Sequence, residues 1–244
     1  MAMARYFSIL LASAVFLAAS LPWEPAAGLA RAASAASLEK AQDEGRLTPE
    51  ESAAIEATIE QARAQGLPTA PFAAKVDEGL AKRIPGRAIL HALESMRDDY
   101  AFSRDTLAQK GGTPSPEDIA LAGDSLRLGL SRQELSALAA LKPPAPAAML
   151  ATAARTLAYL KAVDFPSALS TGILRQGLAS GSLTPGWTQL FRVVQRAREA
   201  GVTDQALAEA ATRTLLDGGG PAELLQDLGF TGRDTRQAPG DSGN

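Results

Sequence analysis

The chain has 244 residues, of which 46% are hydrophobic and 21% are charged, and this apolar content is enough to build a packed core. Its formal net charge of -3 leaves no excess of Lys and Arg to neutralise phosphates, which disfavours a nucleic-acid-binding role. The absence of cysteine excludes disulfides, a lipid-bearing cysteine and the usual zinc sites.

Residues 1–32 have the layout of a secretory signal peptide. Arg5 precedes an apolar run from Tyr6 to Ala19, which is followed by Pro22 and many small residues. The run is shorter than the roughly 20 residues of a membrane span, although an uncleaved anchor is the alternative. We therefore expect a mature chain that begins between residues 29 and 36. After cleavage it should be periplasmic or extracellular, with no membrane segment.

Residues 33–230 carry the patterns of an all-α protein. No segment shows sustained alternation of β-branched and polar residues. Three stretches place a hydroxyl residue at a helix start and an acid three positions later, the capping-box pattern: Thr48 to Glu51, Ser115 to Asp118 and Ser131 to Glu134. Apolar residues recur at steps of three and four, and these faces should be buried: Ile89, Leu93, Met96 and Tyr100, and Trp187, Leu190, Val194 and Ala197.

Glycine and proline divide this region into helices, with breaks at 66–68, 111–114, 142–144, 181 and 218–221. We expect one α-helical domain over residues 33–230, and the best place for a hinge is near residues 111–116. Residues 231–244 have no large apolar side chain, which predicts a disordered tail.

A repeated motif suggests how the helices are arranged. The string GRLTP at 45–49 recurs as GSLTP at 181–185, and Gly79, Gly129 and Gly177 follow one another at spacings near 50 residues. An internal repeat of this kind predicts helical hairpins stacked as a compact bundle or a short α-solenoid. Gly45, Gly79, Gly129 and Gly181 would then lie in or beside turns. The alternative is coincidence, because helix-capping patterns alone produce such matches in an alanine-rich chain.

The stretch around Gly45 matches a calcium-binding EF-hand loop only in part. With Gly45 at the sixth position, Leu47 and Glu51 fall at the eighth and twelfth, as the loop requires. The first and third positions are Lys40 and Gln42, and an ammonium group has no lone pair to offer a cation. The sequence therefore predicts a helix joint here, and it indicates no metal site and no cofactor elsewhere.

Catalytic residues cannot be assigned from sequence. The single histidine, His91, lacks the partners of a zinc site, and neither a nucleophile turn of the G-x-S-x-G type nor a phosphate-binding loop occurs. Glu78, Glu94 and Asp98 are the acids nearest to apolar faces and could serve a glycosidase as paired carboxylates. Their ordinary role is the solvation of helix surfaces.

One group of cations is a candidate binding site. Lys75, Lys82, Arg83 and Arg87 surround Gly79 and could form a patch for an anionic partner, although cations also favour helix C-termini. We expect an exported, non-enzymatic α-helical binding or scaffold protein of the cell envelope, whose partner is a protein or an envelope polymer. The alternative is a cell-envelope hydrolase that uses paired carboxylates. A deep pocket with converging acids would favour the enzyme, and a shallow helical surface would favour the binder.

Overall fold

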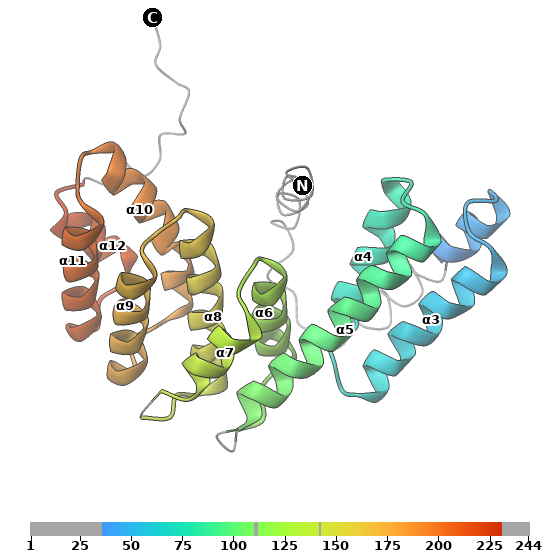
Figure 1. Cartoon of the computed structure of the whole chain (residues 1–244), viewed down its shortest axis with the longest axis horizontal. Helices are drawn as coiled ribbons and strands as arrows, with labels where there is room; N and C mark the ends of the chain where they lie inside the picture. The colour runs from blue at the N-terminus through green and yellow to red at the C-terminus, as the bar shows by residue number, and fades with distance from the viewer. Residues whose placement is uncertain (1–35, 110–111, 142, 231–244) are drawn as a thin grey trace, which may run out of the picture. The chain divides into compact units, whose positions relative to one another are not determined.

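The computed structural model describes residues 36–109, 112–141 and 143–230, and these residues are all-α, without strands, as predicted. The expected signal peptide and tail lie outside the described residues. Residues 36–43 are helical and precede the elements labelled in Figure 1. These elements are α3 (Pro49–Ala64), α4 (Ala70–Ala81), α5 (Gly86–Ala108), α6 (Pro116–Arg127), α7 (Arg132–Ala139), α8 (Ala147–Ala162), α9 (Ser167–Ser180), the 3-10 helix η1 (Pro185–Gln189), α10 (Leu190–Glu199), α11 (Asp204–Leu216) and α12 (Pro221–Asp227).

The chain divides into two units, and the boundary falls within α5 between Asp98 and Asp99. Unit 1 contains the helix at 36–43, α3, α4 and the first part of α5. Unit 2 contains the rest of α5 and every later element. The boundary differs from the hinge expected near residues 111–116, which stays a prediction.

The core of unit 1 is built from the apolar faces of α3, α4 and α5, of which the α5 face was predicted above from its apolar spacing. Phe72 and Val76 on α4 are fully buried, as is Ile55 on α3. On α5, Ile89 and Leu93 are 3% and 0% exposed. Burial of such side chains contributes about 1.5 to 3 kcal/mol each, so these faces hold the short helices of this unit in place.

In unit 2, α8 is the central helix. It packs against α6, α7, α9, η1 and α10, and α9 lies beside α11 (Figure 1). Ala151, Ala154 and Ala158 on α8 are fully buried, and their small side chains let neighbouring helices approach closely. Trp187 is also fully buried. It lies on the 3-10 turn η1, so the apolar stripe that we expected to be one α-helix begins before α10.

All three predicted capping boxes are present. At the start of α3, the Glu51 backbone N–H donates to the Thr48 hydroxyl over 3.2 Å, and the Thr48 N–H donates to the Glu51 carboxylate over 3.1 Å. Ser115 with Asp118 and Ser131 with Glu134 repeat this exchange at α6 and α7. Each box satisfies two backbone donors that a helix start would otherwise leave unpaired.

Most helix ends are made by a glycine in the left-handed conformation. Gly45, Gly129 and Gly181 have φ values of +66°, +104° and +76°, which only glycine adopts without strain. Gly79 is different, because it is a helical residue in the last turn of α4 and is buried. A Cβ atom there would lie 2.7 Å from Ile89 Cγ1. Close packing, and not a positive φ, therefore explains this glycine.

The two GxLTP joints share their local geometry. In each joint the glycine, Gly45 or Gly181, is left-handed. The leucine two positions later is buried, with Leu47 5% exposed and Leu183 2% exposed. Threonine then precedes a proline that begins α3 or η1. This similarity concerns the two joints and not the helices on either side. A repeat of whole helical hairpins therefore stays a prediction.

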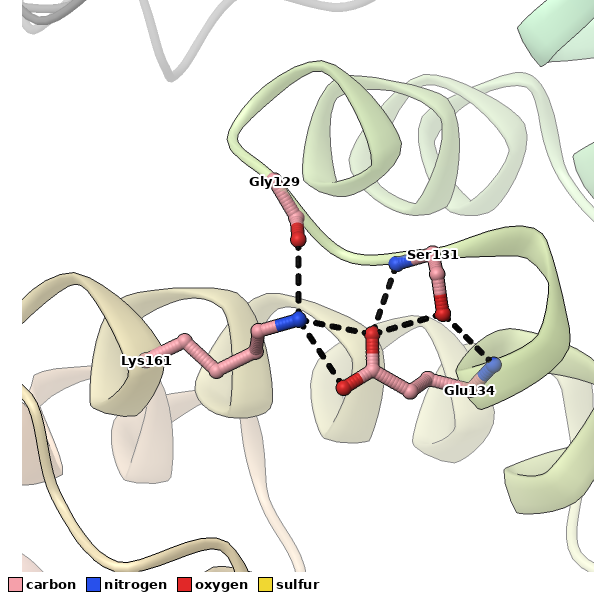
Figure 2. Close-up of polar contacts among 4 residues, drawn as sticks. All are labelled: Gly129, Ser131, Glu134 and Lys161. Carbon is pink, nitrogen blue, oxygen red and sulfur yellow. Dashed lines mark hydrogen bonds and ion pairs between the residues drawn. The ribbon is translucent and has the colours of Figure 1, made fainter. Parts of the chain in front are cut away.

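A lysine closes the end of α6, as Figure 2 shows. The Lys161 ammonium on α8 donates to the Gly129 carbonyl over 2.9 Å, and it lies 2.9 and 2.7 Å from the two oxygens of the Glu134 carboxylate. Glu134 also accepts from the backbone and hydroxyl of Ser131 over 2.7 and 2.8 Å. This cluster joins α8 to the connection between α6 and α7.

The same arrangement closes two further helix ends. In unit 1, Arg46 donates to the Leu80 carbonyl at the end of α4 and to the Glu44 carboxylate, over 3.0 and 2.7 Å. In unit 2, Arg198 donates to the Val163 carbonyl over 2.6 Å, just after α8, and pairs with Asp204 over 2.9 Å. Carbonyls at helix C-termini lack intrahelical partners, so these cations satisfy them and bind neighbouring elements together.

Candidate functional site

The predicted basic patch lies in unit 1, around the joint between α4 and α5. Its two lysines are occupied by one acid. Lys75 Nζ and Lys82 Nζ lie 2.9 and 2.6 Å from the Glu78 carboxylate. Burial raises the pKa of Glu78, but the hydrogen bonds and charges of Lys82 and Lys75 together lower it further, so its pKa is below the ordinary value. Glu78 is therefore ionised at neutral pH and offsets much of the lysine charge.

The two arginines of the patch are exposed. Within the described residues, neither Arg83 nor Arg87 has an ion pair or hydrogen bond from its side chain. Arg83 has φ +55°, the left-handed position that glycine takes at most other helix ends. An open hollow at the start of α5 is lined by Pro85, Arg87, Ala88, Leu90, His91 and Glu94. The structure thus brings Arg87 together with His91 at this hollow, which Arg83 does not line. Binding of an anionic partner here stays a prediction.

The three candidate acids differ in their surroundings. Glu78 is held by two lysines, Glu94 is exposed on α5, and Asp98 lies 3.1 Å from Arg97. A general acid needs a pKa raised toward neutrality, whereas the pKa of Glu78 is lowered. Over the three described stretches, no group of three or more His, Asp and Glu side chains is placed to hold a metal ion.

A second surface, in unit 2, was not predicted. It centres on a pair of aromatic rings from two helices. The centroids of Tyr159 on α8 and Phe191 on α10 are 4.9 Å apart, with the ring planes inclined by 50°. Both residues are half-buried.

An arginine lies over each ring. The Arg155 guanidinium is 5.5 Å from the centroid of Tyr159, and that of Arg192 is 5.7 Å from the centroid of Phe191. Arg155 is mostly covered, with 13% of its side chain exposed, whereas Arg192 is exposed. A cation over a ring is stabilised by the negative face of the ring, by about 0.5 to 1 kcal/mol at an exposed site.

Asp124 on α6 connects this surface to α5. Its Oδ1 accepts the Tyr100 hydroxyl over 2.8 Å, and its Oδ2 lies 3.5 Å from Arg155 Nη2. Burial and the adjacent Asp124 carboxylate raise the pKa of Tyr100, so its hydroxyl remains a donor. The Nε of Arg155 is buried and has no hydrogen-bond partner within the described chain. We refer to Asp124, Arg155, Tyr159, Phe191 and Arg192 as the Arg–aromatic strip.

Sequence reasoning missed the strip for a simple reason. In sequence, Arg155 only interrupts the apolar run from Pro144 to Leu160, and Phe191 lies beside, not on, the apolar stripe of its helix. The available signal was local: Arg155 and Tyr159 are four residues apart and share one helix face, and Phe191 is followed directly by Arg192. The meeting of the two halves depends on how α8 and α10 pack.

No helix in the described part of the chain is both long and apolar enough to cross a membrane. Comparison of the chain with protein-family models, with curated proteins and with solved structures gives no match. Function must therefore be argued from the two surfaces themselves.

Proposed function

We propose that this protein is an exported, non-enzymatic α-helical binding protein of the cell envelope, and that its Arg–aromatic strip contacts the partner. The observation that carries the proposal is the arrangement of two half-buried rings, each with a guanidinium over it, on neighbouring helices. Arginine and aromatic side chains are enriched at binding interfaces, and arginine, tyrosine and tryptophan are enriched among the residues that carry most of the binding energy.

The strip is also suited to binding because Arg155 and the two rings are held in place. Arg155 is fixed by Asp124, whose other oxygen is engaged by Tyr100. Both aromatic residues stand on helices that pack against one another in unit 2. A surface that is ordered before its partner arrives loses less entropy on binding, which raises affinity.

The hydrolase alternative lacks a supporting observation. Glu78 is surrounded by the two lysines that keep it ionised, and an ionised carboxylate cannot act as the proton donor of a glycosidase. Export rests on the leader at residues 1–32, and the partner class, a protein or an envelope polymer, is addressed by the experiment below.

The test is affinity capture of partners from envelope extract with the mature protein. A double variant of the strip, Phe191→Ala with Arg192→Gln, should lose the partner that the unaltered protein retains. The matched control is Arg175→Gln with Arg213→Gln, which changes two exposed arginines on α9 and α11 of the same unit. Thermal unfolding of each variant checks that the fold is intact. Retention of the partner by a folded strip variant, or its equal loss from the control, would refute the proposal.

A further inference from the structure

We infer that the Arg–aromatic strip binds an extended acidic peptide in which an apolar side chain lies between two carboxylates. This inference rests on the proposed function and specifies the ligand. It follows from three features of the strip, namely its charge, the orientation of its rings and the spacing of its groups.

The charge of the strip favours an anionic ligand. The strip contains two arginines, Arg155 and Arg192, and one carboxylate, that of Asp124, which pairs with Arg155. A further cation, Arg127, lies one turn from Asp124 on α6. Asp124 is already engaged, since Tyr100 donates to one oxygen and Arg155 lies near the other. Within the described chain, the side chain of Arg192 makes no hydrogen bond or ion pair. Each guanidinium has five N–H donors, so unused donors remain for carboxylates of a ligand.

The ring orientation favours an apolar side chain over a sugar or a nucleobase. A flat sugar or base stacks on an open ring face, but one face of Tyr159 and one of Phe191 lie under guanidinium groups. The rings also incline by 50° to each other, so they do not form a flat platform. An aliphatic side chain can pack against two inclined rings without needing a flat surface.

The spacing of the strip fits an extended chain. Successive groups from Arg155 through Tyr159 and Phe191 to Arg192 are separated by 5.5, 4.9 and 5.7 Å. An extended peptide places every second side chain on one side, at intervals of about 7 Å. The steps between neighbouring groups of the strip are comparable with this interval. The inferred peptide places a carboxylate at Arg155, an apolar side chain at the ring pair and a second carboxylate at Arg192.

The probe for this inference is a fluorescein-labelled synthetic peptide with glutamate, leucine and glutamate at alternate positions, separated by serines. Fluorescence anisotropy with the mature protein should show saturable binding that weakens as salt is added, because charge pairs carry part of the affinity. Arg192→Gln, at an exposed position that leaves the fold intact, should weaken binding about tenfold, as expected for one lost charge-assisted hydrogen bond. Arg213→Gln should leave binding unchanged, and a peptide with glutamine in place of glutamate should not bind.

Three results would overturn the inference. One is the absence of saturable binding up to millimolar concentration, and another is equal binding by the Arg192→Gln variant. The third is binding of polygalacturonate, an acidic polysaccharide, in preference to the peptide. In each case the capture experiment separates the two proposals. If Phe191→Ala with Arg192→Gln still abolishes capture of the native partner, the ligand class is wrong and the binding function stands. If capture is unchanged, the proposed function itself fails.

Discussion

Lys161 on α8 and Glu134 in the first turn of α7 form an ion pair, with Nζ and Oε2 2.7 Å apart. The same lysine donates to the carbonyl of Gly129, and the same glutamate completes the capping box of α7. One residue pair thus links the end of α6, the start of α7 and the side of α8.

This cluster predicts an acid-sensitive contribution to stability. Burial raises the pKa of Glu134, but Lys161 and Ser131 together lower it further, to below its ordinary value of 4.5. A carboxyl with a lowered folded pKa stabilises the protein above the unfolded pKa, and that stabilisation disappears as the pH falls through the folded value. The free energy of unfolding should therefore decline as the pH falls below about 4.5.

Glu134→Gln tests this prediction. The variant should lower the free energy of unfolding by about 1 kcal/mol at pH 7, since it loses the ion pair and weakens the cap. It should also show a shallower decline in acid than the unaltered protein. Urea unfolding at pH 7 and pH 3.5 provides the comparison, and identical acid slopes for the two proteins would contradict the assigned pKa direction.

Gly79 should tolerate alanine poorly because of packing. The added Cβ would meet Ile89 Cγ1 and Cδ1 at 2.7 and 2.8 Å, and Ile89 is 3% exposed, so Gly79→Ala should cost about 1 to 3 kcal/mol. Ile89→Val removes one of the two contacted atoms and should reduce that cost in the double variant. At Gly45, where a Cβ meets nothing within 4 Å, Gly45→Ala should be destabilising through its φ of +66° alone. Additive effects of the Gly79 and Ile89 changes in denaturant unfolding would exclude the clash.

Arg83 occupies a strained backbone position. A left-handed conformation costs a non-glycine residue about 1 to 2 kcal/mol, and glycine at this position removes that cost. Glycine also makes the unfolded chain more flexible, which offsets part of the stabilisation. Arg83→Gly should therefore raise the free energy of unfolding by about 0.5 to 1 kcal/mol. Arg87→Gly, a change within the first turns of α5, should lower it, and this contrast in thermal unfolding identifies the strain. A destabilised Arg83→Gly variant would show that the Arg83 side chain contributes to the fold.

Alanine substitutions at Trp187 and Phe191 should differ in their cost to the free energy of unfolding, because only Trp187 lies in the core. Trp187 is fully buried, so Trp187→Ala should cost about 3 to 5 kcal/mol. Phe191 is half-buried and pairs mainly with Tyr159, so Phe191→Ala should cost only about 1 to 2 kcal/mol. Denaturant unfolding measures both, and equal losses would mean that Phe191 belongs to the core and not to a binding surface.

Local patterns predicted the fold well, because caps and turns are decided by neighbouring residues. Thr48, Ser115 and Ser131 could be recognised as caps from the acid three positions later, and each forms the expected box. Gly79 shows the limit of this approach. A glycine required by a positive φ and a glycine required by the side chain of Ile89 look alike in sequence, and only the packing of α4 on α5 distinguishes them.

The candidate sites depended still more on tertiary contacts. Lys75 and Lys82 were expected to offer positive charge to a partner. The helical spacing of α4 instead places Glu78 between them, and both lysines pair with it. The pairing of Tyr159 with Phe191 joins residues more than 30 positions apart, and no periodic pattern reports such a contact. Propensities describe each helix, whereas a binding surface arises from the way several helices pack.

The most direct test of binding through the Arg–aromatic strip is site-specific photocrosslinking in intact cells. A photoreactive phenylalanine analogue at Phe191 should yield a discrete adduct with the partner, because this ring would contact it. The same analogue at Arg213, an exposed position on α11 of the same unit, should yield none. Absence of an adduct at Phe191, or equal adducts at both positions, would contradict partner binding through the strip.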